Sequence, residues 1–267
     1  MEKLVLTGIG EVAQLLSTQD KLKNTFRWDV FPEVKLCRWQ SSYEHTIEIT
    51  WITMRVMFHL KKFYPNLDLF ILLLGAFLHD YGEIIFDSSS PGDVNFHDKK
   101  ENNDHQLGEL QVFNKLVDAS GRESNEFFAD LLPFYLLQYG ADQNQINDLI
   151  VKLDYQDGHD LVFRHKEFES KIFDAIENLG YLVFAYQEYL TGKEHSLSFF
   201  LEILKDHSPI LFKYSQEIKG FELFYSLQDH ENILDFIATH QDIENSWDLA
   251  DRLLQEKRVQ LDILANE

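Results

Sequence analysis

The sequence predicts an all-α fold, and three observations support this prediction. Apolar residues recur at helical spacing through most of the 267-residue chain. Strand signals are nearly absent, because no Asn-Gly or Asp-Gly hairpin turn stands between two alternating runs. Five widely spaced prolines stand where helices can begin or end. We therefore expect a bundle of helices joined by polar turns.

The N-terminal helices are delimited by polar and proline-containing turns. A first helix is expected over 10–24, and an irregular stretch follows over 25–42. A long helix over 43–63 ends before Pro65, and the next, over 67–86, ends at the turn that contains Pro91.

The polar segment after Pro91 is expected to be a loop, and helical patterns resume beyond it. The remaining helices are expected over 105–119, 123–139, 142–153, 168–191, 196–204, 211–227, 231–239 and 246–264.

The chain shows no internal repeat and no linker rich in Gly, Ser or Pro. Its hydrophobic content of 45% suits a packed core. We therefore expect one helical domain over 1–194, with a C-terminal helical extension over 195–267 packed on the same domain.

The charge of the chain limits its partners. The formal net charge is -21, and no run of clustered Lys and Arg occurs. Nucleic-acid polymers and membrane surfaces need such clusters, so both are disfavoured as partners. A small anionic substrate remains compatible with this charge, because a bound metal and a few placed cations can reverse the field locally.

Cysteine usage and hydropathy indicate a cytoplasmic protein. Cys37 is the only cysteine, which excludes an internal disulfide and a cysteine zinc cluster. The N-terminus lacks the basic and apolar segments of a signal peptide. The most apolar stretch, 67–85, is interrupted by charged residues and by His79, so we expect a buried helix there and no membrane span.

The segment 72–83 carries the strongest functional signal. His79 and Asp80 follow an apolar run that has no polar residue after Asp68. On an α-helix His79 and Glu83 lie four residues apart and share one face. An unpaired buried carboxylate costs several kcal/mol, so Asp80 requires a cation, either a metal ion or a buried Arg or Lys.

His45, on the preceding predicted helix, shares an apolar stripe with Ile49, Ile52 and Val56. Two histidines and one aspartate on neighbouring buried faces are suitable ligands for a divalent transition metal. Two simpler interpretations compete: His45 is a hydrogen-bonded core histidine, and His79 and Asp80 cap a helix end. All three buried groups would then have to satisfy one another, which favours the metal.

The order of these residues resembles a known pattern. A lone His, a later His-Asp pair after an apolar helix and an Asp on a further helix form the H…HD…D pattern of the HD superfamily. The matching residues are His45, His79, Asp80 and Asp174. The resemblance implies an all-helical HD-domain bundle, and most members of this superfamily are metal-dependent phosphohydrolases.

A closer resemblance is to the YfbR-like 5′-deoxynucleotidases. Cys37-Arg38-Trp39 stands before Tyr43-Glu44-His45, and the sequence FLHDYGE follows at 77–83. The helix around Asp174 and its continuation to Gly192 match the late-Asp helix of that family. The resemblance covers about residues 20 to 192 and leaves the C-terminal part unexplained.

The resemblance implies one divalent metal ion, which can be Mn, Co, Zn, Ni, Fe or Mg. Its implied ligands are His45, His79, Asp80 and Asp174. Asp174 lies at the edge of its apolar stripe, and three aspartates compete with it: Asp154, Asp157 and Asp160. His97 and His105 stand where dinuclear members carry extra ligands, and the simpler interpretation is two solvated histidines.

The resemblance also implies the substrate-binding and catalytic residues. Arg38 would bind the phosphate, and Trp39 would contact the sugar and disfavour a ribose 2′-hydroxyl. Glu83 would polarise or deprotonate the attacking water. Asp87 is the nearest match for a second acidic residue at this water, and Asp93 competes for that role.

The predicted function is that of a metal-dependent phosphohydrolase acting on the 5′-phosphate of deoxynucleoside monophosphates. Alternatives are a (d)NTP hydrolase or phosphodiesterase with the same site, a di-iron oxygenase, and a non-catalytic nucleotide-binding protein. The expected partner is a small phosphorylated substrate, a nucleotide, and the expected assembly is a homodimer. Its interface or the core would use the aromatic residues at 127–128, 199–200 and 221–225.

Overall fold

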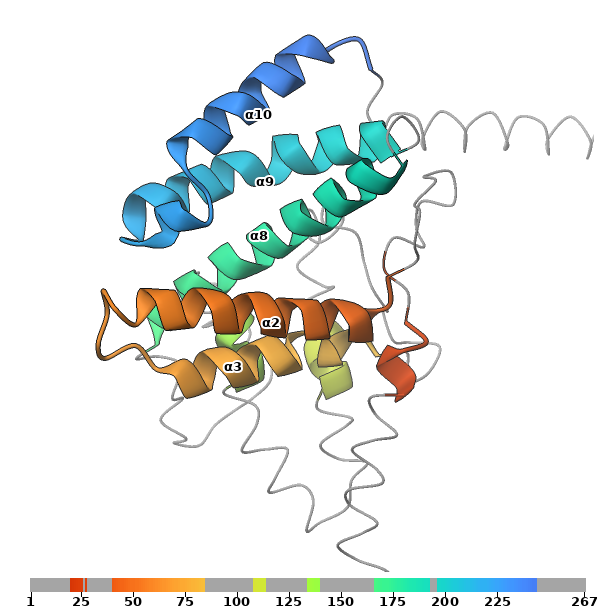
Figure 1. Cartoon of the computed structure of the whole chain (residues 1–267). Coiled ribbons are helices and arrows are strands. Elements are labelled where there is room, and N and C mark those ends of the chain that lie inside the picture. Colours follow the sequence, from red (N-terminus) through yellow and green to blue (C-terminus); the bar gives the residue numbers. More distant parts are fainter. Residues whose placement is uncertain are drawn as a thin grey trace, which may run out of the picture. The chain divides into compact units, whose positions relative to one another are not determined.

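The protein is described by a computed structural model that covers residues 20–25, 27, 40–84, 108–113, 134–139, 166–192 and 196–243. Within these residues 81% are helical and none belongs to a strand, which confirms the all-α class for the described part of the chain (Figure 1). They fall into two compact units, one ending at Asp174 and the other beginning at Ala175. The division falls inside the long helix Glu167–Gly192, and the predicted domain boundary at 194 stays a prediction.

Helix α2 (Ser42–Leu60) begins at a complete N-terminal cap. The Ser41 hydroxyl accepts a hydrogen bond from the backbone N–H of Glu44, and the Glu44 carboxylate accepts one from the backbone N–H of Ser41. The predicted apolar stripe is confirmed at His45, Ile49 and Val56, which are buried, whereas Ile52 is half-buried. The cap therefore fixes the start of the helix that carries His45.

Helix α3 (Leu69–Leu78) lies beside α2 in the first unit (Figure 1). The Asp68 carboxylate caps it by accepting hydrogen bonds from the backbone N–H groups of Phe70 and Ile71. α3 is strongly apolar but only 10 residues long. None of the helices in the described ranges has both the length and the apolar character needed to cross a membrane.

Asp68 also connects the start of α3 to the start of α8 (Glu167–Gly192). Its carboxylate lies 2.8 Å from Lys166 Nζ, and its backbone N–H donates to Glu169. Burial alone would raise the pKa of Asp68, but the Lys166 ammonium and the two helix N–H groups lower it below its ordinary value.

The predicted helix over 67–86 is wrong in its C-terminal part. α3 ends at Leu78, and His79–Glu83 form a 3-10 helix, η1. A Cβ atom at Gly82 would lie only 2.1 Å from the Tyr135 hydroxyl, so this turn packs too closely for a side chain there. Residues three apart align in a 3-10 helix, and Glu83 therefore shares a face with Asp80 and not with His79.

The core of the first unit lies around η1. Like Gly82, Gly75 in α3 packs closely against a neighbouring segment. A Cβ atom at Gly75 would lie 2.6 Å from Leu137 in the short 3-10 helix η2 (Leu136–Tyr139). The buried cluster comprises Leu22, Leu78, Tyr81, Ile84, Leu110, Val112, Phe113, Tyr135 and Leu136. Tyr81 of η1 and its neighbours Leu78 and Ile84 belong to this cluster, so apolar packing fixes the position of η1.

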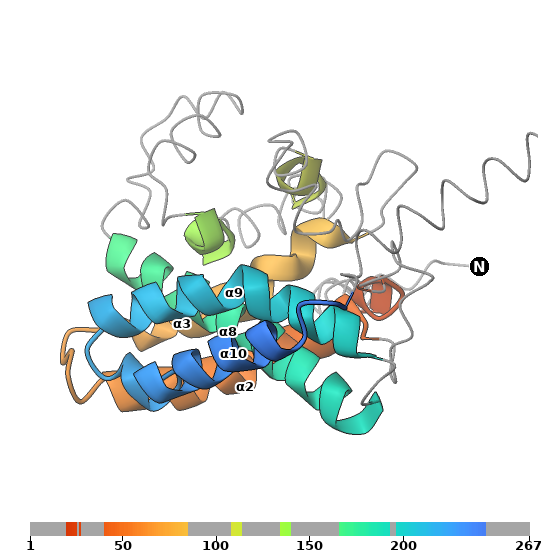
Figure 2. The ribbon, with the colours of Figure 1, turned by 90° about the horizontal axis from the view of Figure 1, so that it is seen from above.

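The second unit contains the rest of α8, helix α9 (Leu197–Glu217), the 3-10 helix η5 (Phe221–Leu223) and helix α10 (Leu227–Thr239). α9 and α10 lie side by side in both views (Figure 1 and Figure 2). The rings of Tyr189 and Phe200 stack between α8 and α9 with centroids 4.7 Å apart. α10 has no buried residue, and it borders an apolar pocket of about 470 Å³ shared with α8 and α9.

Most of the described aromatic residues assigned to the core or to a dimer interface are buried within the chain. Phe199, Phe200, Phe221 and Tyr225 are buried, and Phe224 is half-buried. The pair at 127–128 lies outside the described residues.

The two helices predicted over 196–204 and 211–227 are one helix up to Glu217, so the expectation that Pro209 ends a helix is wrong. A proline in a helix leaves the carbonyl group four residues earlier without its usual hydrogen bond. Pro209 and Lys205 are both exposed, so water can bind this carbonyl. Buried Ser208 and Leu211 on the opposite side anchor the helix through the break.

Candidate metal centre

The first turn of α2 presents three polar side chains on its buried side. Ser42, His45 and Thr46 are only 0%, 3% and 2% exposed. Their spacing of three and four residues places them on one face of the helix. Because the cap at Ser41 fixes this turn, it also fixes where the His45 imidazole lies.

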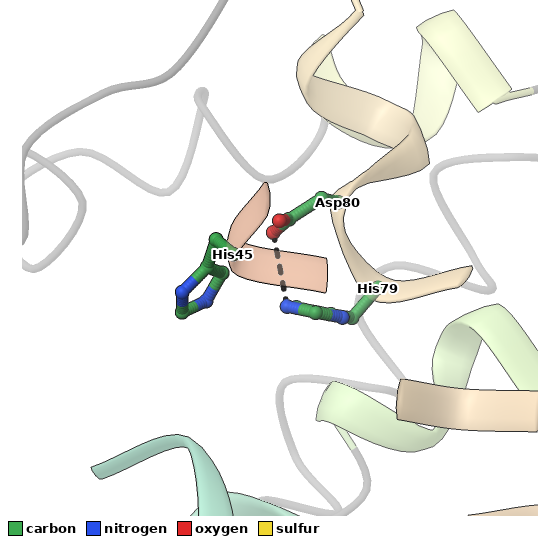
Figure 3. Close-up of side chains that lie close together, drawn as sticks. All are labelled: His45, His79 and Asp80. Carbon is green, nitrogen blue, oxygen red and sulfur yellow. Dashed lines mark ion pairs between the residues drawn. The ribbon is translucent and has the colours of Figure 1, made fainter. Parts of the chain in front are cut away.

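His79 and Asp80 begin η1, directly after the apolar helix α3. The His79 Nδ1 lies 2.7 Å from the carbonyl oxygen of Ala76, which can only accept, so Nδ1 carries a proton. The other nitrogen, Nε2, faces Asp80 Oδ1 at 3.1 Å (Figure 3). This arrangement suits a cation between the two atoms, either a proton or a metal ion.

His45, His79 and Asp80 form one group, in which a ligand atom of each residue lies within 4.8 Å of the other two (Figure 3). All three are buried. Metal–nitrogen and metal–oxygen bonds of about 2.1 Å place adjacent donors about 3.0–3.5 Å apart, so the 3.1 Å between His79 and Asp80 fits a shared ion. Two imidazoles and one carboxylate are a donor set for a divalent transition metal, with positions left for water.

Asp174, the predicted fourth ligand, lies on α8 and does not belong to this group. Its side chain is partly exposed. The neighbouring residue Phe173 is fully buried, and its ring packs edge-on against His79 with centroids 5.5 Å apart. α8 therefore passes next to the site, and a ligand role for Asp174 stays a prediction.

A buried arginine, which the sequence analysis did not identify, also belongs to the site. Arg27 Nη1 lies 3.2 Å from Asp80 Oδ1 and 3.5 Å from Glu83 Oε2. The 3-10 geometry of η1 aligns these two carboxylates, so one guanidinium group contacts both. The Arg27 backbone N–H donates to the carbonyl of Gln40, which ties this residue to the segment just before α2.

Two hydroxyl groups of α2 hold the same carboxylates. Ser42 Oγ donates to Glu83 Oε2, and Thr46 Oγ1 donates to Asp80 Oδ2, each at 3.1 Å. The N-terminal turn of α2, the positive end of its dipole, thus faces two negative groups, which is favourable. Charged and neutral donors together orient Asp80 and Glu83.

The sequence required a cation near Asp80 and left open whether it is a metal ion or a buried Arg or Lys. Arg27 is such a residue, at 3% exposure. Its only local signal is that Arg27-Trp28 repeats the Arg38-Trp39 dipeptide to which the phosphate and sugar contacts were assigned.

Of the predicted catalytic residues, Glu83 is described. It is 3% exposed, and it contacts Arg27 and Ser42 next to the metal group without belonging to it. The other predicted or competing residues lie outside the described ranges, and their roles stay predictions: Arg38, Trp39, Asp87, Asp93, His97, His105, Asp154, Asp157 and Asp160.

The sequence matches no protein-family model and none of the curated proteins. The resemblance to the HD superfamily therefore rests on the motif residues themselves.

Proposed function

We propose that the protein is a metal-dependent phosphohydrolase that removes the 5′-phosphate of deoxynucleoside monophosphates. One observation carries the hydrolase part: the buried group of His45, His79 and Asp80 lies next to the buried carboxylate of Glu83. The choice of a deoxynucleotide substrate rests on the motif resemblance around Arg38 and Trp39.

The described residues have complementary roles in this proposal. A bound divalent metal would acidify a coordinated water and polarise a phosphoryl oxygen. Arg27 and Thr46 orient the Asp80 carboxylate toward the metal group. Glu83 is held by Ser42, one turn of η1 from Asp80, where it can accept the proton of the attacking water.

The charge of the site suits a phosphate. With neutral histidines, the ionised Arg27, Asp80 and Glu83 carry one positive and two negative charges. A divalent metal reverses this sign and leaves the group positive. A phosphate anion is then attracted to the site although the whole chain carries -21.

Phosphate release from paired panels of dNMP, NMP and dNTP tests the proposal. The wild type with Mn²⁺ or Co²⁺ is expected to release phosphate from dNMP and to prefer it over NMP. His79→Ala is expected to abolish the release, whereas His59→Ala, elsewhere on α2, is expected to keep it.

Two of the competing functions predict different outcomes in this assay. Preferred cleavage of dNTP indicates the triphosphate hydrolase. Tight dNMP binding without phosphate release indicates a non-catalytic nucleotide-binding protein. Equal rates on dNMP and NMP contradict the sugar-discriminating role of Trp39 but leave the phosphohydrolase intact.

A further inference from the structure

Arg27 holds the same carboxylate that the proposed metal would bind. Its Nη1 contacts Asp80 Oδ1, the oxygen atom that also faces His79 Nε2. The side chains of Arg27 and Asp80 are only 4% and 3% exposed, so water screens their charges poorly. A guanidinium group and a metal ion would therefore act on one carboxylate at short range.

The Arg27 guanidinium group and a bound metal ion would compete for the same negative charge. Asp80 and Glu83 are buried together, and without a cation their negative charges would be costly. Arg27 offsets this cost when no metal is bound. A divalent ion neutralises the same charge and repels the guanidinium group, so each cation weakens the binding of the other.

We propose that Arg27 is an internal counter-ion, which keeps the site assembled in metal-stripped protein and lowers its metal affinity by competing for Asp80. This inference rests on the proposed metal-dependent function. Arg27 is then a positioning residue that acts through Asp80. The site does not need a metal to fold, and its metal remains exchangeable.

The Arg27→Met variant tests the proposal, because Met removes the charge and keeps much of the apolar stem. Calorimetric titration of Mn²⁺ into chelator-stripped protein is expected to show about tenfold tighter binding than in the wild type. The Tm of the stripped variant is expected to fall by about 6 °C or more, since a buried charge pair has lost one partner. Arg55→Met, at an exposed position of α2, should change neither value.

A second variant separates charge from packing. Glu83→Gln removes one negative charge, so the double variant Arg27→Met/Glu83→Gln has the charge balance of the wild type. We expect the double variant to recover most of the Tm that Arg27→Met loses without metal. If Arg27 only fills space, Glu83→Gln will bring no recovery.

The outcomes distinguish this inference from the function on which it rests. Mn²⁺ binding by the wild type, with equal or weaker binding by Arg27→Met, overturns the counter-ion role and leaves the metal-dependent function standing. Mn²⁺ binding by neither protein overturns both. An Arg27→Met protein that folds only with Mn²⁺, where the wild type also folds without it, supports the inference. If Arg27→Met and the double variant are both unfolded with and without Mn²⁺, the counter-ion role is wrong.

Discussion

The two units of the protein differ in how closely their buried charged side chains are gathered. Around the start of α2 and in η1, the first unit buries two histidines, two carboxylates and an arginine that contact one another. The second unit also buries Glu188, Glu202 and His207, but its packing between α8 and α9 consists largely of aromatic rings. In the first unit, removing one charged group leaves the charge of its buried neighbours incompletely balanced. In the second, removing one ring mainly costs packing, so we assign the chemistry to the first unit.

The largest expected effect on metal binding and activity is that of Asp80→Asn. The substitution keeps the shape of the side chain and removes the charge that the metal and Arg27 share. Metal affinity and kcat/KM are both expected to fall at least about 100-fold, since even a residue that only orients a ligand costs 10–100-fold. Titration with Mn²⁺ and steady-state phosphate release measure the two effects.

Asp235→Asn, at an exposed position of α10, is the matched control and should behave as the wild type. Unchanged metal affinity in Asp80→Asn would show that the metal binds elsewhere. The assignment of the metal chemistry to this group in the first unit would then be wrong.

The second unit should respond to the loss of packing without any change in metal binding. Phe184 on α8 is 2% exposed, and its ring packs against Phe199. Phe184→Ala is expected to cost about 3–5 kcal/mol of unfolding free energy. Leu190→Ala, at an exposed position of the same helix, should cost less than about 0.5 kcal/mol.

Urea unfolding measures these costs, and Mn²⁺ titration of both variants checks the metal site. A change in metal affinity in Phe184→Ala would contradict the separation between the two units.

The smallest expected effect is at Asp68, where the first unit uses a partly exposed ion pair. Asp68→Ala removes the cap of α3 and the pair with Lys166, and it is expected to cost about 1–2 kcal/mol. Asp68→Asn keeps a capping oxygen and should lose less than about 1 kcal/mol.

The pH dependence of this contribution has a defined sign. The pKa of Asp68 is lowered from its ordinary value of 3.8, so the ionised group stabilises the fold above this pH. The difference in stability between the wild type and Asp68→Asn should therefore shrink as the pH falls below about 3.8, and it should disappear once the pH is also below the lowered pKa of Asp68 in the folded protein. A difference that persists at lower pH would contradict the assigned ion pair.

The sequence predicted the meeting of His45, His79 and Asp80, and their grouping is confirmed. Helical spacing on α2 and the end of the apolar run in α3 are local patterns, and a single sequence displays them. The prediction that Glu83 shares a face with His79 was wrong, because the two residues lie in a 3-10 helix. The turn at Gly82 packs closely against Tyr135, and helical periodicity does not show such a contact between distant segments.

Arg27 shows the same limit more clearly. It contacts residues in η1 that are 53 and 56 positions away, and no spacing rule connects them. Physical reasoning required a cation at Asp80 but could not choose among the basic residues of the chain. The prediction that Pro209 ends a helix was wrong for a related reason. A helix can contain a proline where the carbonyl left without a partner faces water, and the sequence alone did not show which side of α9 is exposed.

Metal stoichiometry together with the identity of the ligands tests the central claim most directly. Elemental analysis of the protein, combined with anomalous scattering from crystals grown with Mn²⁺ or Zn²⁺, measures both. We predict one divalent ion per chain, bound by His45, His79 and Asp80. A folded protein that binds no ion at saturating metal, or an ion bound away from these three residues, contradicts the account. Two ions, with His97 or His105 as a ligand, contradict its mononuclear form.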